Sequence, residues 1–181
     1  MGRRRLVDFA TPATAAALAV AATGLGSPTD SPPRCRTRQL HLAPTFYGEA
    51  GGEFTQTLTF VNASRRPCSL RGWPRLSLQS KSGGLVRVAS RRVRQGEPGT
   101  PAFRTVVLRS RHAASFDVYG SDWHHAASRP CSKTRIAWIT PPGAYSSLSV
   151  AVKMPNCGRF YIAPVVAGGT DRRSWSLLWS G

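Results

Sequence analysis

The densest group of titratable side chains in this sequence is Asp122, His124 and His125, within the run Asp-Trp-His-His. A carboxylate and two imidazoles can hold a metal ion or act as a general base, which is the chemistry of a small hydrolase or a metal-dependent enzyme. Adjacent residues of an extended chain point to opposite sides, so His124 and His125 are poorly placed to share one ion. The run also lies in an expected loop between Gly120 and Pro130. A solvent-exposed loop is therefore the preferred interpretation, and the enzyme is the alternative.

A second group of side chains is basic. Eight basic residues and a single acid occupy the segment 80–111, and Arg91, Arg92 and Arg94 lie closest together, at the start of an expected loop over Arg91–Ala102. A guanidinium can bind phosphate or carboxylate through two parallel hydrogen bonds, so these three arginines form a candidate anion-binding site. The alternative is a solvated surface that only reflects composition, because arginine supplies 22 of the 25 basic residues and the net charge is +17.

Other signatures of catalysis are missing from the sequence. It contains no Gly-x-Ser-x-Gly motif and only eight acidic residues, none arranged as a converging pair. Asp117 alternates with Phe116 and Val118, so we expect its side chain to point outward from a strand. The sequence therefore predicts no catalytic residue, no cofactor and no metal site.

The four cysteines, Cys35, Cys68, Cys131 and Cys157, are even in number and widely spaced, which predicts two disulfides. Neither a Cys-x-x-Cys motif nor a paired His/Cys spacing is present, so zinc binding is disfavoured. Disulfides persist in oxidising compartments, which predicts a secreted or otherwise extracytoplasmic protein.

The N-terminus supports export. Arg3, Arg4 and Arg5 precede a moderately apolar, alanine-rich run, so residues 1–26 are predicted to be a cleaved signal peptide, with a short membrane anchor as the alternative. The arginines also fit a twin-arginine signal loosely, so the export route stays open. A proline-rich linker is expected over 27–34, and one folded domain over 35–181.

The elements that must position these side chains are strands. In Glu53–Asn62, Phe54, Leu58 and Phe60 alternate with threonines, which predicts a strand with one buried and one wet face. Strands are expected at Gln39–Leu42, Glu53–Asn62, Cys68–Arg71, Arg75–Gln79, Leu85–Ala89, Val106–Leu108, Ala114–Tyr119, Thr134–Ile139, Ser147–Val152 and Phe160–Val166. Short strands separated by turn signals, without a helical pattern, predict an all-β fold, an immunoglobulin-like antiparallel β-sandwich.

A family resemblance is carried by the order of the motifs. Asn62-Ala63-Ser64 is followed by Cys68-Ser69-Leu70-Arg71-Gly72-Trp73-Pro74, with Cys35 before and Cys131 and Cys157 after them. This pattern resembles the actinobacterial family of exported proteins called domain of unknown function 4232, over roughly Cys35 to Val166. The resemblance implies a secreted or envelope-located β domain and supplies no catalytic residues. The basic segment 81–111 and the aromatic C-terminal tail depart from it.

The resemblance also favours sequential disulfides, Cys35 with Cys68 and Cys131 with Cys157. A Cys68–Cys131 bridge would suit the intersheet bond of an immunoglobulin domain, but Trp73 lies too close behind Cys68 to be the buried tryptophan of that fold.

Two further segments allow two interpretations each. Asn62-Ala63-Ser64 matches a glycosylation sequon, but a turn after a strand is the simpler explanation. In the tail, Trp175, Leu177 and Trp179 share one face, which fits an edge strand or an apolar tail that touches lipid or a partner.

These observations predict an exported, non-catalytic binding or structural module of the cell envelope. Its expected partner is an anionic envelope polymer or membrane surface at the Arg91–Arg94 segment. Nucleic acid is not expected, because its recognition motifs are missing.

Overall fold

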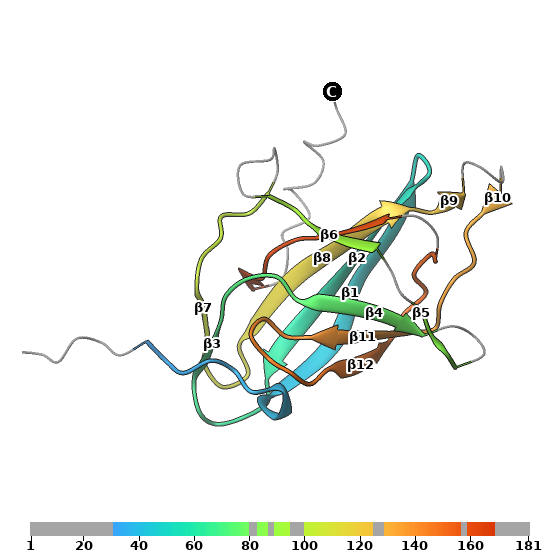
Figure 1. Ribbon diagram of the computed structural model, residues 1–181. Coiled ribbons are helices and arrows are strands. Elements are labelled where there is room, and N and C mark those ends of the chain that lie inside the picture. Colours follow the sequence, from blue (N-terminus) through green and yellow to red (C-terminus); the bar gives the residue numbers. More distant parts are fainter. Residues whose placement is uncertain are drawn as a thin grey trace, which may run out of the picture. The chain divides into compact units, whose positions relative to one another are not determined.

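The computed structural model describes residues 31–79, 83–86, 89–94, 100–124, 129–156 and 159–168. The predicted signal peptide, Cys157, His125 and the tryptophan-containing tail lie outside the described residues. Within the described ranges the elements, shown in Figure 1, are one 3-10 turn, η1 (Thr37–Gln39), and the strands β1 (Leu40–Ala50), β2 (Glu53–Asn62), β3 (Cys68–Leu70), β4 (Arg75–Gln79), β5 (Leu85–Val86), β6 (Ala89–Arg92), β7 (Val106–Leu108), β8 (Ala113–Ser121), β9 (Trp123–His124), β10 (Arg129–Pro130), β11 (Ile136–Thr140), β12 (Leu148–Ala151), β13 (Arg159–Ile162) and β14 (Val166–Ala167).

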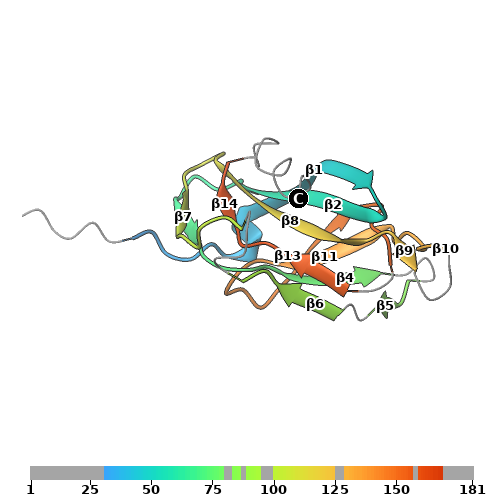
Figure 2. The same cartoon turned by 90° about the horizontal axis from the view of Figure 1, so that it is seen from above.

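The strands form two principal sheets. The larger has the order β1-β2-β8-β13-β6, with β14 paired to β8, and the smaller has the order β12-β11-β4-β5 (Figures 1 and 2). Two short pairs, β3–β7 and β9–β10, complete the described part of the chain. Neighbouring strands are antiparallel except β6, which pairs parallel with β13. The predicted all-β class with antiparallel sheets is thus confirmed. Within the described ranges, no helix is long and apolar enough to cross a membrane.

Both sheets bury side chains in one core. Phe54, Leu58 and Phe60 of β2 are at most 1% exposed, as the alternation in the sequence predicts. They belong to the same buried cluster as Leu78 of β4 and Ile139 of β11, which are fully buried. Burial of one such side chain stabilises the fold by about 1.5–3 kcal/mol, so this cluster is what holds the two sheets together.

The opposite face of β2 differs from the prediction. Thr57 and Thr59 were expected to face water, but they are 2% and 6% exposed. Thr59 Oγ1 lies 3.0 Å from both Thr45 Oγ1 and Ser115 Oγ, and Ser115 Oγ donates to the Gly168 carbonyl at 2.6 Å. Since each hydroxyl finds a partner on the neighbouring strand, the row can be buried at little cost. Polar residues here form a hydrogen-bonded layer and not a wet surface.

Several predicted boundaries also differ. The first strand does not end at Leu42 but continues to Ala50, through an irregular register between Pro44 and Phe46. The expected loop over Arg91–Ala102 is wrong at its start, because β6 runs to Arg92. The expected loop over Gly120–Pro130 is wrong at both ends, where β8, β9 and β10 extend into it.

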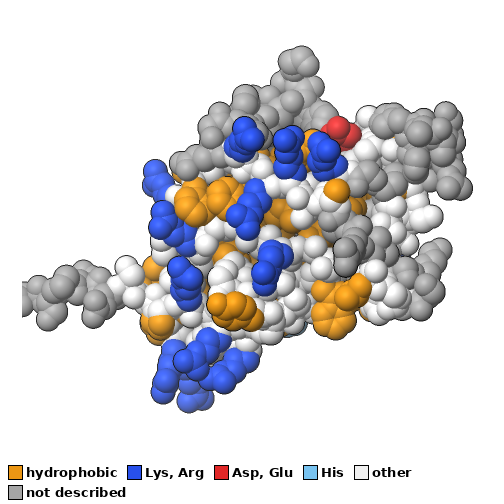
Figure 3. All heavy atoms as spheres, in the orientation of Figure 1, with side chains coloured by type: hydrophobic (Ala, Val, Ile, Leu, Met, Phe, Trp, Pro, Cys, Tyr) orange, Lys and Arg blue, Asp and Glu red, His pale blue; other side chains and the backbone are white. Residues whose placement is uncertain are grey.

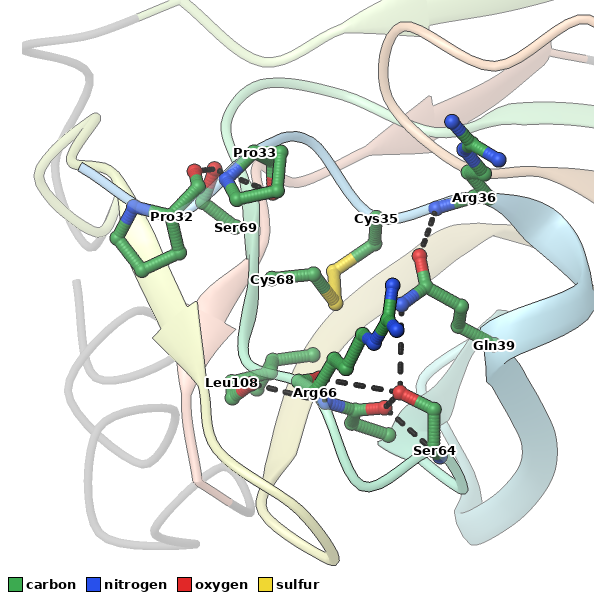
Figure 4. Close-up of a disulfide and its surroundings, with 11 residues drawn as sticks. Pro32, Pro33, Cys35, Arg36, Gln39, Ser64, Arg66, Cys68, Ser69 and Leu108 are labelled. Atoms are coloured by element: carbon green, nitrogen blue, oxygen red, sulfur yellow. Dashed lines mark hydrogen bonds between the residues drawn. A yellow bond between two sulfur atoms is a disulfide. The ribbon is translucent and has the colours of Figure 1, made fainter. Parts of the chain in front are cut away.

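A disulfide ties the start of the domain to β3. Cys35 and Cys68 are bonded, with their Cα atoms 4.8 Å apart, and both are buried (Figure 4). The Ser69 amide donates to the Pro33 carbonyl at 2.9 Å, so chain contacts begin before Cys35. The predicted Cys35–Cys68 bridge is therefore confirmed, and it is consistent with an extracytoplasmic location. Within the described ranges no cysteine is free, whereas the predicted partner of Cys131 lies outside them.

Asn62 closes β2 with its side chain. Its Nδ2 donates to the carbonyls of Arg66 and Leu108, both at 2.9 Å. Its Oδ1 accepts from the amide and the hydroxyl of Ser64, at 2.9 and 2.7 Å. Asn62 is fully buried. The Asn-x-Ser motif is thus an Asx-type turn, as the simpler of the two interpretations predicts, although Asn62 does not adopt the left-handed backbone.

Candidate anion-binding site

Strand β6 carries Arg91 and Arg92, and Arg94 follows its end. It pairs with β13 so that Arg91 lies opposite Tyr161 and Arg92 opposite Ile162. The pairing continues one step further, where the Val93 amide donates to the Ile162 carbonyl at 3.1 Å. Val93 is 4% exposed, whereas Arg91, Arg92 and Arg94 are all exposed. The buried valine thus anchors the segment while the guanidinium groups stay in solvent.

The three arginines line a common recess. Arg91, Arg92, Arg94 and Tyr161 enclose about 120 Å³. This volume is well below the 300–1,000 Å³ of sites for drug-sized ligands, and it suits a single oxyanion group. A phosphate or carboxylate here would lie beside three arginines, each of which can offer two parallel N–H donors for bidentate recognition.

Stacked aromatic rings support the recess from β8 and β13. Tyr161 pairs across the ladder with Tyr119, and their ring centroids are 5.4 Å apart with planes inclined by 13°. The two rings share the face that carries Arg91, the Cα partner of Tyr161. Tyr161 is thereby held in place as a wall of the recess.

A second aromatic stack supports Arg92. Trp73 stacks on Phe103 with centroids 4.8 Å apart, and the Arg92 guanidinium lies 5.8 Å from the Trp73 ring. Trp73 Nε1 donates to the Val93 carbonyl at 3.1 Å, which ties the ring to the arginine segment. Gly72 turns the chain before Trp73 with φ 116°, a conformation that favours glycine. The Gly-Trp-Pro motif therefore positions the site.

Charge at the recess is uncompensated within the described part of the chain. Among the described residues the one ion pair is Lys133–Glu49, at 2.6 Å, and neither residue lines the recess. No described carboxylate pairs with Arg91, Arg92 or Arg94. Figure 3 shows Lys and Arg side chains spread over the visible face with little acidic surface between them. The recess is thus suited to attract an anion.

The alternative site at Asp122, His124 and His125 is described only in part. The Asp122 backbone is held by hydrogen bonds with Gly52 and Cys131, at 3.0 and 2.9 Å. His125 and the side chain of His124 lie outside the description. Among the described residues, no group of three His, Cys, Asp or Glu side chains is placed to hold a metal ion. The enzyme alternative stays a prediction.

Sequence reasoning missed the aromatic partners of the arginines and one buried acid. Tyr161 could have been suspected only as an aromatic residue at an outward position of its strand.

Asp117 points away from the core, as expected, but it is 1% exposed. Thr57 Oγ1 donates to Asp117 Oδ1 at 2.5 Å, and none of the described cations pairs with this carboxyl. Burial raises the pKa of Asp117 to about 6, against a smaller opposing effect of the Thr57 hydrogen bond.

Asp117→Asn is expected to raise the free energy of unfolding at pH 7.5 by up to about 3 kcal/mol, since one pKa unit corresponds to about 1.4 kcal/mol. An unfolded aspartate ionises near pH 4, so between about pH 4 and pH 6 the folded protein holds a proton that the unfolded chain has lost. Asp117 therefore makes its full contribution to the free energy of unfolding below about pH 4, and this contribution is lost as the pH rises from about 4 to 6. Asparagine keeps an oxygen acceptor for Thr57 and removes the titration.

Urea unfolding of both proteins at pH 4 and pH 7.5 measures this effect. The gain should be large at pH 7.5 and small at pH 4. An equal gain in the free energy of unfolding at both pH values would show that the raised pKa of Asp117 is not its cause.

Comparison with known proteins places these features in a family. The sequence profile of a family described as a domain of unknown function (DUF4232) matches residues 35–166. The matched range contains the disulfide, the Asn62 turn and the arginine recess. No curated protein and no solved structure matches the chain.

Proposed function

Because the chain belongs to the family of domain of unknown function DUF4232, whose description assigns no activity, we propose its function from the arginine recess. We propose that the protein is an exported, non-catalytic module of the cell envelope that binds phosphate groups through Arg91, Arg92 and Arg94. The phosphate belongs either to an envelope polymer or to a lipid head group. The observation that carries the proposal is that Arg91, Arg92 and Arg94 all line one recess of about 120 Å³ and that no described carboxylate pairs with them.

The architecture suits this role. We infer that the two principal sheets form an immunoglobulin-like β-sandwich, on the support of their shared core and largely antiparallel order. Such a scaffold presents a site on a rigid edge of a sheet. The disulfide stabilises the folded domain in the oxidising environment outside the cytoplasm. Export through the N-terminal signal peptide is part of the same proposal.

Replacing Arg91, Arg92 and Arg94 together by glutamine is expected to weaken phosphate binding at least tenfold. Each charge-assisted hydrogen bond contributes about 1.5–3 kcal/mol, and about 1.4 kcal/mol corresponds to a factor of ten. Binding is measured at low salt in two arms, by fluorescence anisotropy with labelled polyphosphate and by sedimentation with vesicles of phosphatidylglycerol. The arm with the larger loss identifies the source of the phosphate.

A matched control separates the recess from net charge. Arg65, Arg66 and Arg109 are exposed, and none of them lines the recess. Their joint replacement by glutamine removes the same three charges, and it should weaken binding less than threefold. Equal losses in both variants would show that only overall charge matters, and no binding in either arm at low salt would end the proposal.

A further inference from the structure

A second cavity, larger than the arginine recess, lies at the β1 edge of the larger sheet. Strands β1 and β6 are at opposite ends of the order β1-β2-β8-β13-β6, and the arginine recess belongs to β6. The cavity borders β1 where its register shifts between Pro44 and Phe46, and it is a solvent-open hollow of about 540 Å³. This volume lies within the range of small-molecule sites. Its apolar walls include Phe46, which is 42% exposed, together with Tyr47 and Ala151.

A buried glutamine contributes a polar group to this cavity. Gln56 occupies an inward position of β2 between Phe54 and Leu58, and it is 3% exposed. Its Nε2 donates to the carbonyls of Phe46 and Thr57, at 2.7 and 3.0 Å. Two carbonyl acceptors on this atom fix the orientation of the amide.

The other end of the amide is left open. Gln56 Oε1 accepts no hydrogen bond from the described residues. It is not fully enclosed either, because Trp138 Nε1 is the one fully buried side-chain atom without a partner in the described ranges. Oε1 is therefore available to the cavity. Because this oxygen is an acceptor that solvent reaches, it can accept a hydrogen bond from a ligand that brings an N–H or O–H donor.

Two cations lie at the rim. Arg135 precedes β11 and Lys153 follows β12, and both line the cavity with exposed side chains. A hydrogen bond of 2.9 Å from the Val152 amide to the Arg135 carbonyl keeps the two segments adjacent. Neither cation pairs with a carboxylate in the described part of the chain.

The nearby acid does not cancel this charge. Glu49 is bonded to Lys133 at 2.6 Å and accepts a hydrogen bond from Tyr47. These two hydrogen bonds, the one from Lys133 first, lower the pKa of Glu49. The acid is thus paired with Lys133, while Arg135 and Lys153 remain for an anionic ligand.

We propose that this cavity binds an amphipathic organic acid. The ligand has an apolar chain at one end, a carboxylate group at the other, and an amide N–H or a hydroxyl group between them. The chain lies against Phe46 and Ala151, the donor meets Gln56 Oε1, and the carboxylate meets Arg135 and Lys153. An N-acylated amino acid has this order of groups. The site is independent of the arginine recess and of the function proposed for it.

N-decanoylglycine, used below its micelle concentration, is the probe. In a titration followed by ¹H–¹⁵N correlation spectra, we expect shifts of the Gln56 side-chain amide and of the Ala151 and Val152 backbone amides. Signals of Arg91 to Val93 should stay in place. Shifts spread over unrelated surfaces, or no binding up to millimolar probe, would overturn the proposal.

Two analogues of the probe test its polar groups one at a time. Decanoyloxyacetic acid replaces the amide N–H by an ester oxygen and should bind at least fivefold more weakly, since Gln56 Oε1 loses its donor. The methyl ester of N-decanoylglycine removes only the charge and should bind about tenfold more weakly. Equal affinity of all three compounds would show binding by apolar contact alone and would exclude the proposed arrangement.

Variants test the protein side. The double variant Arg135→Gln with Lys153→Gln should bind the probe at least tenfold more weakly. The control Arg65→Gln with Arg66→Gln removes the same charge in a turn that does not line the cavity, and it should change the affinity less than twofold. Ala151→Trp fills the cavity from an exposed position and should abolish binding while the dispersion of the spectrum stays native. Retained binding in Ala151→Trp, or equal losses in both double variants, would refute the site.

Discussion

Replacing Cys35 and Cys68 together by alanine is expected to lower the free energy of unfolding by about 3–4 kcal/mol. The bridge closes a loop across a sequence separation of 33 residues, and without it the unfolded chain gains the conformational freedom of that loop. Alanine suits the site because both cysteines are buried, at 4% and 0% exposure. Urea unfolding, followed by circular dichroism, measures the loss.

Single variants distinguish the cross-link from local packing. The covalent bond is lost as soon as either cysteine is replaced, so Cys35→Ala and Cys68→Ala should each cost nearly as much as the double variant. If the two single losses instead add up to the double loss, the contribution comes from the packing of each sulfur. Intact mass with and without reductant establishes the bridge in the starting protein.

Asn62→Ala is expected to lower the free energy of unfolding by about 3–4 kcal/mol, mainly because it leaves buried partners without hydrogen bonds. The side chain donates to Leu108 on β7 and to Arg66 in the turn, and it accepts twice from Ser64. Its removal also leaves a cavity at a fully buried position. The loss is measured by urea unfolding.

Ser64→Ala and Asn62→Asp serve as comparisons for this variant. Ser64→Ala removes one of the two hydrogen bonds to Asn62 Oδ1, together with the part-exposed contacts of the hydroxyl with Gln39 and the Arg66 carbonyl, and should cost about 1 kcal/mol. Asn62→Asp keeps the acceptor but loses both donations and buries a charge, so at pH 7 it should cost at least as much as Asn62→Ala. A loss below about 1 kcal/mol for Asn62→Ala would show that water replaces the missing groups.

The fold was predictable where a local pattern decides it. The strand at Glu53–Asn62 has the predicted bounds, because inward Phe54 and Leu58 alternate with β-favouring threonines. The strand at Arg75–Gln79 is likewise confirmed. β1 was predicted too short, since Pro44 and Gly48 suggest a break that the strand absorbs by shifting its register.

Pairing between distant segments was not predictable. β2 pairs with β8, about 60 residues later, and β6 pairs in parallel with β13. Such contacts depend on the packing of the whole chain and leave no local signal. For this reason the density of arginines pointed to Arg91, Arg92 and Arg94, but not to the strand that carries the first two or to Tyr161 beside them.

The second cavity had one signal in the sequence. Gln56 occupies an inward position between Phe54 and Leu58, where an apolar side chain is the expectation. The assignment of Phe54, Leu58 and Phe60 to the core was correct, and the sequence analysis passed over the polar Gln56 between them. The irregularity of β1 and the two cations at the rim come from other strands and could not be inferred locally.

The irregular stretch of β1 has a consequence for how the protein behaves at high concentration. β1 is an 11-residue edge strand, and a long, flat edge is a template for strand addition by a second molecule and for aggregation. Pro44 has no amide hydrogen to offer such a strand, and the register shift beside it interrupts the row of donors and acceptors. With a net charge of +17 adding mutual repulsion, we expect this edge strand to resist self-association.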